Sequence, residues 1–401
     1  MRKKTSKTMK NKRLVIIGAN QFQLPLIIKA NLLGYETHVF AWEDGAVGAE
    51  YADYFYPISI IEKEQILEEC LKIKPIGVVT IGSDLAYITV NYLSRNLGLV
   101  ANPDQTEIIA TNKHEMRKAL ERNNIVVPYY KAICEPKTSK LNFTKDIDEL
   151  VDVGFPLIVK PTDRSGSRAV SYVETREDLE QAVSLAQKLS FEKCALVESV
   201  LVGDEYSCET ISFNGKHNIL QTTRKFTTNQ PNFIEIAHAQ PVCLESKVLN
   251  RITEIVKYSL DALNIKNGAS HTEFRLDNND NPHIIEIGAR MGGDFIGSDL
   301  VSNSTFHDYL AMVIQVAVGD FPNAKSEHSS IYSAVRFAFN EKDCLRLKRF
   351  ISKHPEVVTK SYFTDETMWS KNVFDSSTRL AHVIVKANDT EIINEFLGDL
   401  F

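Results

Sequence analysis

Two glutamates stand where a buried β-hairpin would otherwise be apolar. Glu273 lies in the stretch HTEFRL and Glu286 in HIIEIG, and the turn-forming run DNNDNP separates them. If the turn is symmetric about residues 279 and 280, Glu273 and Glu286 face each other on neighbouring strands. Facing residues have Cβ atoms about 5 Å apart, a distance at which two negative charges destabilise the pair.

A divalent cation between the two carboxylates would remove this repulsion. Mg²⁺ prefers one or two carboxylates together with phosphate oxygens. The hairpin therefore predicts a magnesium–nucleotide site with Glu273 and Glu286 as ligands. The alternative is a solvated face on which the glutamates form ion pairs with Arg275 or Arg290, and the pattern alone leaves both interpretations open.

A second segment has the chemistry of a phosphate-binding loop. The stretch FPLIVKPTDRSGSRAV predicts a strand that ends at Lys160, a polar tip at residues 165–167 and a second strand. Such a tip can fold over phosphates and donate backbone N–H groups. It is no Walker A loop, and an ordinary hairpin turn explains Ser-Gly-Ser as well.

A third segment, ALVESVLVGDEYSCET, predicts a strand ending at Glu198, a short linker and a further strand from Glu205. Backbone groups of such a hinge can hydrogen-bond adenine, and Glu205 can accept hydrogen bonds from ribose hydroxyls. A plain strand–turn–strand explains this segment equally well.

The elements that position these segments begin with an α/β unit. Strands are expected at 13–18, 36–42 and 75–82, with helices near 22–33, 62–73 and 84–96. Ligands bind at the carboxyl ends of such parallel strands, so residues 18–21 and 82–84 are candidate rim positions. The first of these lacks the dinucleotide fingerprint, and a scaffold without a ligand is the alternative.

The remainder of the chain is richer in strands and predicts an α/β and α+β multidomain fold. Helices are expected at 111–124, 176–189 and 244–263. The tail from about residue 327 mixes strands with short helices and is expected to form a separate lobe.

Composition excludes several classes of protein. The chain has 401 residues, 43% of them hydrophobic and 24% charged, which suits two or three globular domains. A net charge of −6 argues against a general nucleic-acid or membrane-surface binder. Because no apolar run reaches 18 residues, no transmembrane helix is expected.

The basic start of the chain and its cysteines indicate a cytoplasmic protein. Residues 1–12 lack the apolar stretch of a signal peptide, so they predict a disordered leader. Six cysteines are scattered without a Cys-x-x-Cys motif, which favours reduced thiols over a disulfide framework or a zinc site.

In order and spacing, these motifs resemble the ATP-grasp superfamily across residues 13–320. The matching motifs are Asn112-Lys113, Lys160-Pro with its Ser-Gly-Ser loop, Glu198 to Glu205, and Glu273, Glu286 and Arg290. Within the superfamily, the stretches EIAHAQP, HTEFRL and EIGARMGGD resemble the L-amino acid ligases, which form dipeptides.

The resemblance implies an ATP-grasp fold in several parts. These are a leader at 1–12, a Rossmann-like pre-ATP-grasp domain at 13–110, an ATP-grasp domain at 111–322 with a small lid subdomain at about 126–200, and a C-terminal α+β lobe at 323–401.

It also implies roles for eight residues around ATP. They are Lys113 and Lys160 at the phosphates, Ser165, Gly166 and Ser167 as a closing lid, Glu198 and Val200 beside adenine, and Glu205 at the ribose.

Glu273 and Glu286 would ligate Mg²⁺, which Mn²⁺ can replace. Arg290 would stabilise a developing acyl phosphate, and Gly292 and Gly293 would let backbone amides approach the substrate. The chain has Glu-Ile-Gly-Ala-Arg where many ATP-grasp enzymes have Glu-x-Asn-x-Arg. The missing asparagine puts a third protein ligand to the metal in doubt, although the peptide-ligase branch often lacks it.

Glu235 and His238 match a spacing that these ligases use near their amino-acid substrates, and would act as catalytic residues beside Arg290. An ordinary buried histidine is the alternative for His238. The implied reaction is ATP-dependent amide formation between small molecules through an acyl phosphate, in a protein for which a homodimer is a family-level expectation. Carboxylation or formyl-phosphate chemistry, and a non-catalytic nucleotide-binding protein, are the alternatives.

Overall fold

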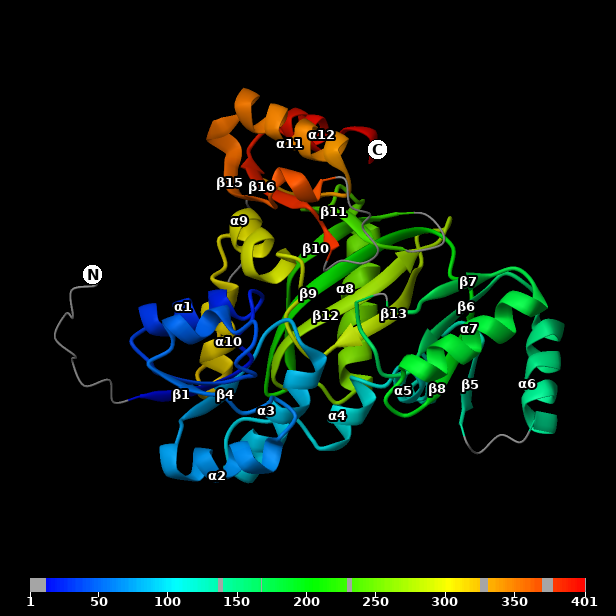
Figure 1. The fold of residues 1–401 in the computed structure, drawn as a ribbon, viewed down its shortest axis with the longest axis horizontal. Coiled ribbons are helices and arrows are strands. Elements are labelled where there is room, and N and C mark those ends of the chain that lie inside the picture. The colour runs from blue at the N-terminus through cyan, green and yellow to red at the C-terminus, as the bar shows by residue number, and fades with distance from the viewer. Residues whose placement is uncertain are drawn as a thin grey trace.

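The computed structural model describes residues 12–135, 140–166, 168–228, 233–324, 331–369 and 378–400. The expected leader, apart from Lys12, and the predicted lid residue Ser167 therefore lie outside the described residues. In the part that is described, three β-sheets and their covering helices form the molecule (Figure 1). No helix of this part is long and apolar enough to cross a membrane.

The first sheet is parallel and has the strand order β3-β2-β1-β4. Its strands are β1 (Arg13–Ile17), β2 (Glu36–Phe40), β3 (Tyr54–Tyr56) and β4 (Gly77–Val79), and its helices are α1 (Leu24–Leu32), α2 (Lys63–Ile73) and α3 (Asp84–Asn96). Four consecutive residues of β1 are buried, as expected for a strand covered on both faces. The β-α-β pattern expected from the sequence is present.

The second sheet is antiparallel and has the order β5-β8-β6-β7. It comprises β5 (Tyr130–Cys134), β6 (Leu157–Pro161), β7 (Ser171–Val173) and β8 (Cys194–Ser199), with α6 (Lys140–Val153) and α7 (Arg176–Leu189). These elements have an apolar core of their own, in which Leu157, Val159 and Leu179 are fully buried. In Figure 1 this unit projects from the side of the molecule. Its role as a lid subdomain stays a prediction.

The third sheet is antiparallel throughout, with the order β13-β12-β9-β10-β11-β14-β16-β15. Its first five strands along the chain are β9 (Asp204–Phe213), β10 (Lys216–Thr227), β11 (Glu235–Gln240), β12 (Gly268–Leu276) and β13 (Pro282–Gly288). The remaining three are β14 (Tyr332–Ala338), β15 (Val358–Phe363) and β16 (Ala381–Ala387).

The tail was expected to pack as a separate lobe, but its strands extend this central sheet. β14 pairs with β11 through Ala237↔Arg336 and the following positions. Apolar packing favours this pairing, because Ala237 and Ala239 share one buried cluster with Val383 and Val385.

Further helices cover the sheets and connect them. They are α4 (Gln105–Ile109), α5 (Lys113–Arg122), α8 (Ser246–Ala262), a π-helical turn (Ile296–Leu300), α9 (Val301–Thr305), α10 (Tyr309–Ala317), α11 (Glu341–Lys353) and α12 (Thr390–Leu397).

The hairpin of β12 and β13 pairs Glu273 with Glu286, as the sequence predicted. The turn differs in detail, because Leu276 pairs with Pro282 and the tip is therefore centred on residue 279. A bulge on β13, in which Ile285 is the extra residue, shifts the register by one residue and restores the predicted pair.

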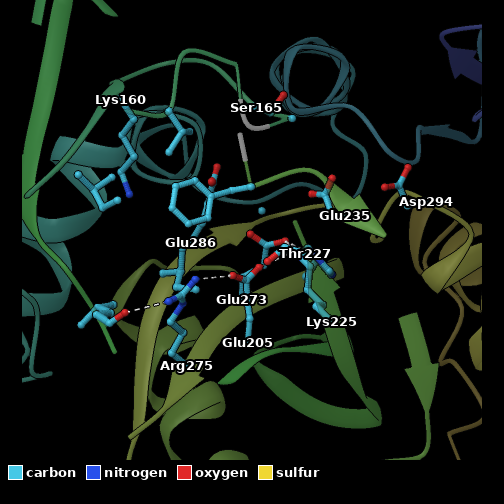
Figure 2. Close-up of a pocket in the computed structure, with 18 of the residues that line it drawn as sticks. Lys160, Ser165, Glu205, Lys225, Thr227, Glu235, Glu273, Arg275, Glu286 and Asp294 are labelled. Carbon is cyan, nitrogen blue, oxygen red and sulfur yellow. Dashed lines mark hydrogen bonds and ion pairs between the residues drawn. The ribbon is translucent and has the colours of Figure 1, made fainter. Parts of the chain in front are cut away.

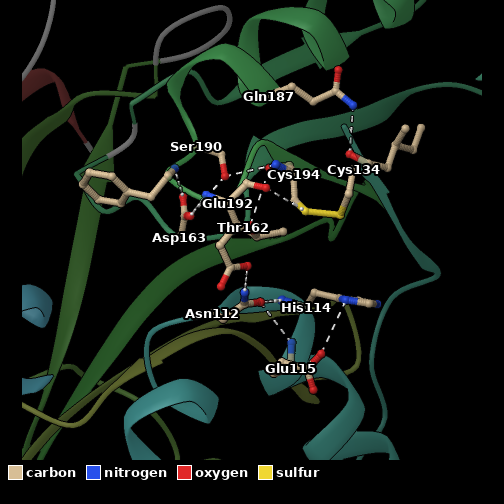
Figure 3. Close-up of a disulfide and its surroundings, with 12 residues drawn as sticks. Asn112, His114, Glu115, Cys134, Thr162, Asp163, Gln187, Ser190, Glu192 and Cys194 are labelled. Atoms are coloured by element: carbon tan, nitrogen blue, oxygen red, sulfur yellow. Dashed lines mark hydrogen bonds and ion pairs between the residues drawn. A yellow bond between two sulfur atoms is a disulfide. The ribbon is translucent and has the colours of Figure 1, made fainter. Parts of the chain in front are cut away.

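Two cysteines contradict the prediction of reduced thiols throughout. Cys134 and Cys194, 60 residues apart, form a disulfide between β5 and β8 (Figure 3). The two residues are direct cross-strand neighbours, which brings their Cα atoms to 4.1 Å. The other four cysteines are free thiols. Spacing along the chain could not predict this bond, because β5 and β8 are not consecutive strands.

Candidate active site

A cavity of about 1160 Å³ lies where the three sheets meet. Figure 2 shows Glu205, Lys225 and Glu273 near its centre, Lys160 on one side, and Glu235 and Asp294 on the other. The predicted site residues that line the cavity are Lys113, Lys160, Ser165, Gly166, Glu198, Val200, Glu205, Glu235, His238, Glu273, Glu286, Arg290 and Gly293. The structure thus brings together segments far apart in the sequence.

Lys113 connects the hairpin of β12 and β13 to the loop that follows β6. Helix α5 starts there because the side chain of Asn112 accepts hydrogen bonds from the next turn's backbone. The Lys113 ammonium lies 2.9 Å from Glu286 and donates to the carbonyl of Arg164 at 2.6 Å. It is therefore held between a predicted metal ligand and the loop that carries Ser165.

Lys160 is held by Glu198 on the neighbouring strand. The Lys160 ammonium and the Arg117 guanidinium each lie 2.6 Å from the Glu198 carboxylate. Burial alone would raise the pKa of Glu198, but Arg117 and Lys160 lower it to about 2. Burial lowers the pKa of Lys160, and the nearby cations Arg117 and Lys113 lower it further. Glu198 acts in the opposite direction, but the lowering effects prevail.

Arg117 also ties this cluster to the hairpin. It is fully buried and donates to the carbonyls of Ile284 and Ile285, at 3.1 and 2.8 Å. The Glu198 carboxylate is thus shared by two cations. The predicted placement of adenine beside Glu198 and Val200 stays a prediction.

Lysines, and not the arginines considered from the sequence, neutralise the facing glutamates. Glu273 pairs with Lys225, which also lies 3.2 Å from Glu205, and Glu286 pairs with Lys113. Burial would raise the pKa of Glu273, but Lys225 and His271 hold it well below its usual range.

The facing glutamates fit a magnesium ion. Each uses one carboxylate oxygen in these contacts, and its second oxygen has no partner among the described residues. The same part of the chain holds no group of three or more metal-ligating side chains. Two free carboxylate oxygens suit Mg²⁺, which takes its other ligands from phosphates and water.

The two arginines have other partners. Arg275 donates to the Leu201 carbonyl at 3.0 Å and lies 3.2 Å from Glu205. Arg290 lies 2.9 Å from Asp84, which begins α3 at the predicted rim of the first sheet. Burial would lower the pKa of Arg290, but Asp84 and Glu286 raise it. Asp84 thereby holds the Arg290 guanidinium near the facing glutamates, Glu273 and Glu286.

A buried carboxylate and a histidine stand behind Glu273. Glu209 on β9 is fully buried and pairs with Nδ1 of His271, whose Nε2 lies 3.1 Å from Glu273. Burial would lower the pKa of His271, but the two carboxylates raise it to about 9. One signal for this pair went unused in the sequence: Glu209 stands among the residues YSCETIS, whose pattern predicts a strand.

Glu209 also explains Gly292. The Gly292 N–H donates to Glu209 at 3.0 Å, and a Cβ at this position would lie 2.5 Å from the same carboxylate. Gly292 therefore packs against the buried pair and does not line the cavity, whereas Gly293 does. The predicted approach of backbone amides to the substrate stays a prediction.

The end of the cavity away from Lys160 is acidic. Glu235 and Asp294 line it, and one guanidinium nitrogen of Arg379 lies 3.0 Å from Glu235 and 2.9 Å from Asp294. Burial, followed by the charge of Asp294, raises the pKa of Glu235. His238 is fully buried at this end, and neither ring nitrogen has a hydrogen-bond partner among the described residues.

Comparison with known proteins identifies one domain of the chain. Residues 153–299 match the ATP-grasp domain family. The chain contains an ATP-grasp domain. Alanine–anticapsin ligase of Bacillus subtilis (strain 168) is 25% identical over 276 residues, which are 60% of this chain and 56% of that protein. The chain therefore matches little more than half the length of this relative.

Solved structures confirm the predicted ATP-grasp fold over nearly the whole chain. L-amino acid ligase from Bacillus licheniformis superposes with a TM-score of 0.80 at 22% identity, covering 98% of each chain. N5-carboxyaminoimidazole synthetase from Staphylococcus aureus, complexed with ADP, has a TM-score of 0.76 at 16% identity, covering 97% of each chain. The expected resemblance to ATP-grasp ligases, including the L-amino acid ligases, is therefore confirmed.

Proposed function

We propose that this chain is an ATP-dependent carboxylate–amine ligase that joins two amino acids as a dipeptide and releases ADP and phosphate. One observation carries the proposal. A single cavity joins the cationic and carboxylate groups suited to Mg-ATP, at Lys113, Lys160, Glu273 and Glu286, to an acidic end suited to an ammonium group.

The nucleotide end places positive charge where phosphates would lie. The ammonium groups of Lys113 and Lys160 would offset phosphate charge. Glu205, whose two oxygens contact Lys225 and Arg275, would accept hydrogen bonds from ribose hydroxyls through its remaining lone pairs. Magnesium held by Glu273 and Glu286 would lower the repulsion between the γ-phosphate and an attacking carboxylate.

In the first step a substrate carboxylate oxygen attacks the γ-phosphorus. The bond to the β-phosphate oxygen breaks, and an acyl phosphate and ADP form. Arg290 would offset the negative charge that grows on the γ-phosphoryl group during transfer, because Asp84 holds the guanidinium near Glu273 and Glu286.

In the second step the amine attacks the acyl carbon, and phosphate leaves as the amide forms. The ammonium group must first lose a proton, which His238 or Glu235 can accept. Burial raises the pKa of Glu235, which brings its carboxylate nearer to a base that works at neutral pH. Burial lowers the pKa of His238, so its ring is neutral at that pH and has a nitrogen lone pair to accept a proton.

The decisive experiment measures phosphate release from Mg-ATP across a matrix of amino-acid pairs, with mass spectrometry of the active wells. Release that requires two amino acids, with a product mass equal to their sum minus water, supports the proposal. Glu273→Gln should abolish it, whereas the exposed Glu254→Gln serves as a matched control.

Two other outcomes would contradict the proposal. Phosphate release that depends on bicarbonate or formate would assign a carboxylase-like or formyl-phosphate reaction. ATP binding without any acceptor-dependent turnover would assign a non-catalytic nucleotide-binding protein. A cytoplasmic location and a homodimer stay predictions from the sequence.

A further inference from the structure

The acidic end of the cavity carries an uneven balance of charge. Two carboxylates, Glu235 and Asp294, share one guanidinium, that of Arg379. Formally, one negative charge is left over. Both carboxylates line the cavity, whereas Arg379 lies behind them with its side chain 7% exposed.

The groups around this end do not cancel that charge. Lys225 on β10 also acts electrostatically on Glu235, but it is ion-paired with two other carboxylates, Glu273 and Glu205. His238 lies 3.8 Å from Asp294, too far for a hydrogen bond, and neither of its buried ring nitrogens has a hydrogen-bond partner in the part of the chain that the structure describes. An unpartnered buried imidazole on the cavity wall indicates that a ligand completes this end.

The loop that carries Asp294 is held in place by the tail of the chain. Asp294 and Phe295 both have positive φ angles, 48° and 66°, which are unfavourable for residues with side chains. The ring of Phe295 lies 4.4 Å from the ring of His382 and beneath the Lys360 ammonium. Such conformations persist where surrounding structure enforces them and are frequent at functional sites.

We propose that Arg379 is a specificity-determining residue that sets the charge of this subsite, so that it takes the ammonium group of an amine substrate with an uncharged side chain. The inference rests on the proposed ligase function and names its amine substrate class. One ammonium group balances the single remaining negative charge. A second positive charge, such as the side-chain ammonium of lysine, would have no carboxylate left to pair with, because Arg379 already neutralises one of the two negative charges.

The test varies the formal charge of the subsite and compares L-norleucine with L-lysine, which have side chains of similar length. The ratio of kcat/KM for lysine to that for norleucine is measured with the best carboxylate partner from the amino-acid matrix. Arg379→Met leaves two negative charges, and we expect this ratio to rise by about tenfold or more. Arg379→Lys keeps the charge and should keep the ratio.

A double variant separates specificity from folding. Arg379→Met leaves two carboxylates facing each other and can lower the melting temperature. Adding Asp294→Asn returns the formal charge to one negative, so Arg379→Met/Asp294→Asn should recover both the melting temperature and the wild-type ratio. An unchanged ratio in folded Arg379→Met, or a lysine preference in the double variant, would overturn the proposal.

The proposal can also fail separately from the ligase function. Titration calorimetry with Mg-ADP present measures binding of lysine and norleucine without turnover. Arg379→Met should bind lysine about tenfold more tightly than the wild type does. Equal lysine affinity in the two proteins would overturn the role of Arg379 even in an active ligase. The expected gain would support it even if no dipeptide forms.

Discussion

At the scale of single residues, Glu198 shows how burial changes what a carboxylate does. Its pKa is lowered from the usual 4.5 to about 2, since Arg117 and Lys160 outweigh the effect of burial. A lowered carboxylate pKa stabilises the fold above pH 4.5. That stability, on the order of 3 kcal/mol, is lost as the pH falls from 4.5 towards 2. Urea unfolding at pH 6, 5, 4 and 3 should show this loss.

Glu198→Gln is the control for this pH dependence. It leaves Arg117 and Lys160 buried without their counter-charge and should cost about 3–5 kcal/mol at neutral pH. The variant should also lose less stability than the wild type between pH 5 and pH 3. Parallel pH curves for the two proteins would show that other carboxylates govern the acid transition.

Arg290 should matter for turnover more than for nucleotide binding. Arg290→Ala removes the cation beside Glu273 and Glu286, and kcat should fall by about 100-fold or more, as for other groups that stabilise transition-state charge. The affinity for ADP, measured by calorimetry, should change little. Asp84→Asn, which frees Arg290 without removing it, should cost less activity, and an equal loss in both would mean that positioning by Asp84 is decisive.

The facing glutamates could be predicted because one hairpin contains them. The local run of turn residues places Glu273 near Glu286 without knowledge of the remaining fold, and the bulge at Ile285 brings the two residues into register. The pairing of Glu209 with His271 and the place of Lys225 depend on strands that are not neighbours in the sequence. Arg379 is harder still, because it reaches Asp294 from 85 residues further along the chain.

At the scale of elements, the disulfide should stabilise the second sheet, β5-β8-β6-β7. It closes a loop of 60 residues between β5 and β8, and bonds of this kind contribute about 2–4 kcal/mol. Dithiothreitol should therefore lower the melting temperature of the wild type. Cys134→Ala/Cys194→Ala should melt at the lower temperature with or without reductant.

Alkylation of the unreduced, denatured protein gives the matching chemical measurement. Mass spectrometry should find four modified thiols, those of Cys70, Cys208, Cys243 and Cys344. Six modified thiols would mean that the bond is absent from the protein as isolated.

The disulfide lies close to parts of the site, which gives it functional weight. The backbone N–H of Thr162 donates to the Cys194 carbonyl, and the carbonyl of Thr162 accepts from the N–H of Lys113. Asn112 also donates to Glu192 at 2.8 Å, two residues before Cys194 (Figure 3). The strands joined by the bond thus support the helix start that carries Lys113.

At the scale of the whole molecule, the central sheet joins strands of the tail to β11 and its neighbours, so we expect the tail to unfold together with them. Val383 on β16 is fully buried in the cluster that also holds Ala237 of β11. Val383→Ala should therefore cost about 2 kcal/mol. Scanning calorimetry should show that the unfolding transition whose temperature rises when Mg-ADP binds moves to a lower temperature in this variant.

Ser361→Ala on exposed β15 is the matched control and should leave the melting temperature within about 1 °C of the wild type. If Val383→Ala instead produced a separate early transition, and left the nucleotide-dependent one unchanged, the tail would be an independent lobe. That was the expectation from the sequence, which could not reveal the pairing of β11 with β14.

The interior position of β11 has a consequence for synthesis on the ribosome. Chains emerge from the amino end at about 5–20 residues per second, so β11 is complete well before β14, its partner on one side, has been made. During that interval β11 presents unpaired backbone groups and the apolar side chains of Ala237 and Ala239, a surface that favours association between nascent chains. Slow translation between residues 240 and 332 would therefore increase the demand for chaperones, and substitutions in the tail would lower the yield of soluble protein more than the specific activity of the molecules that fold.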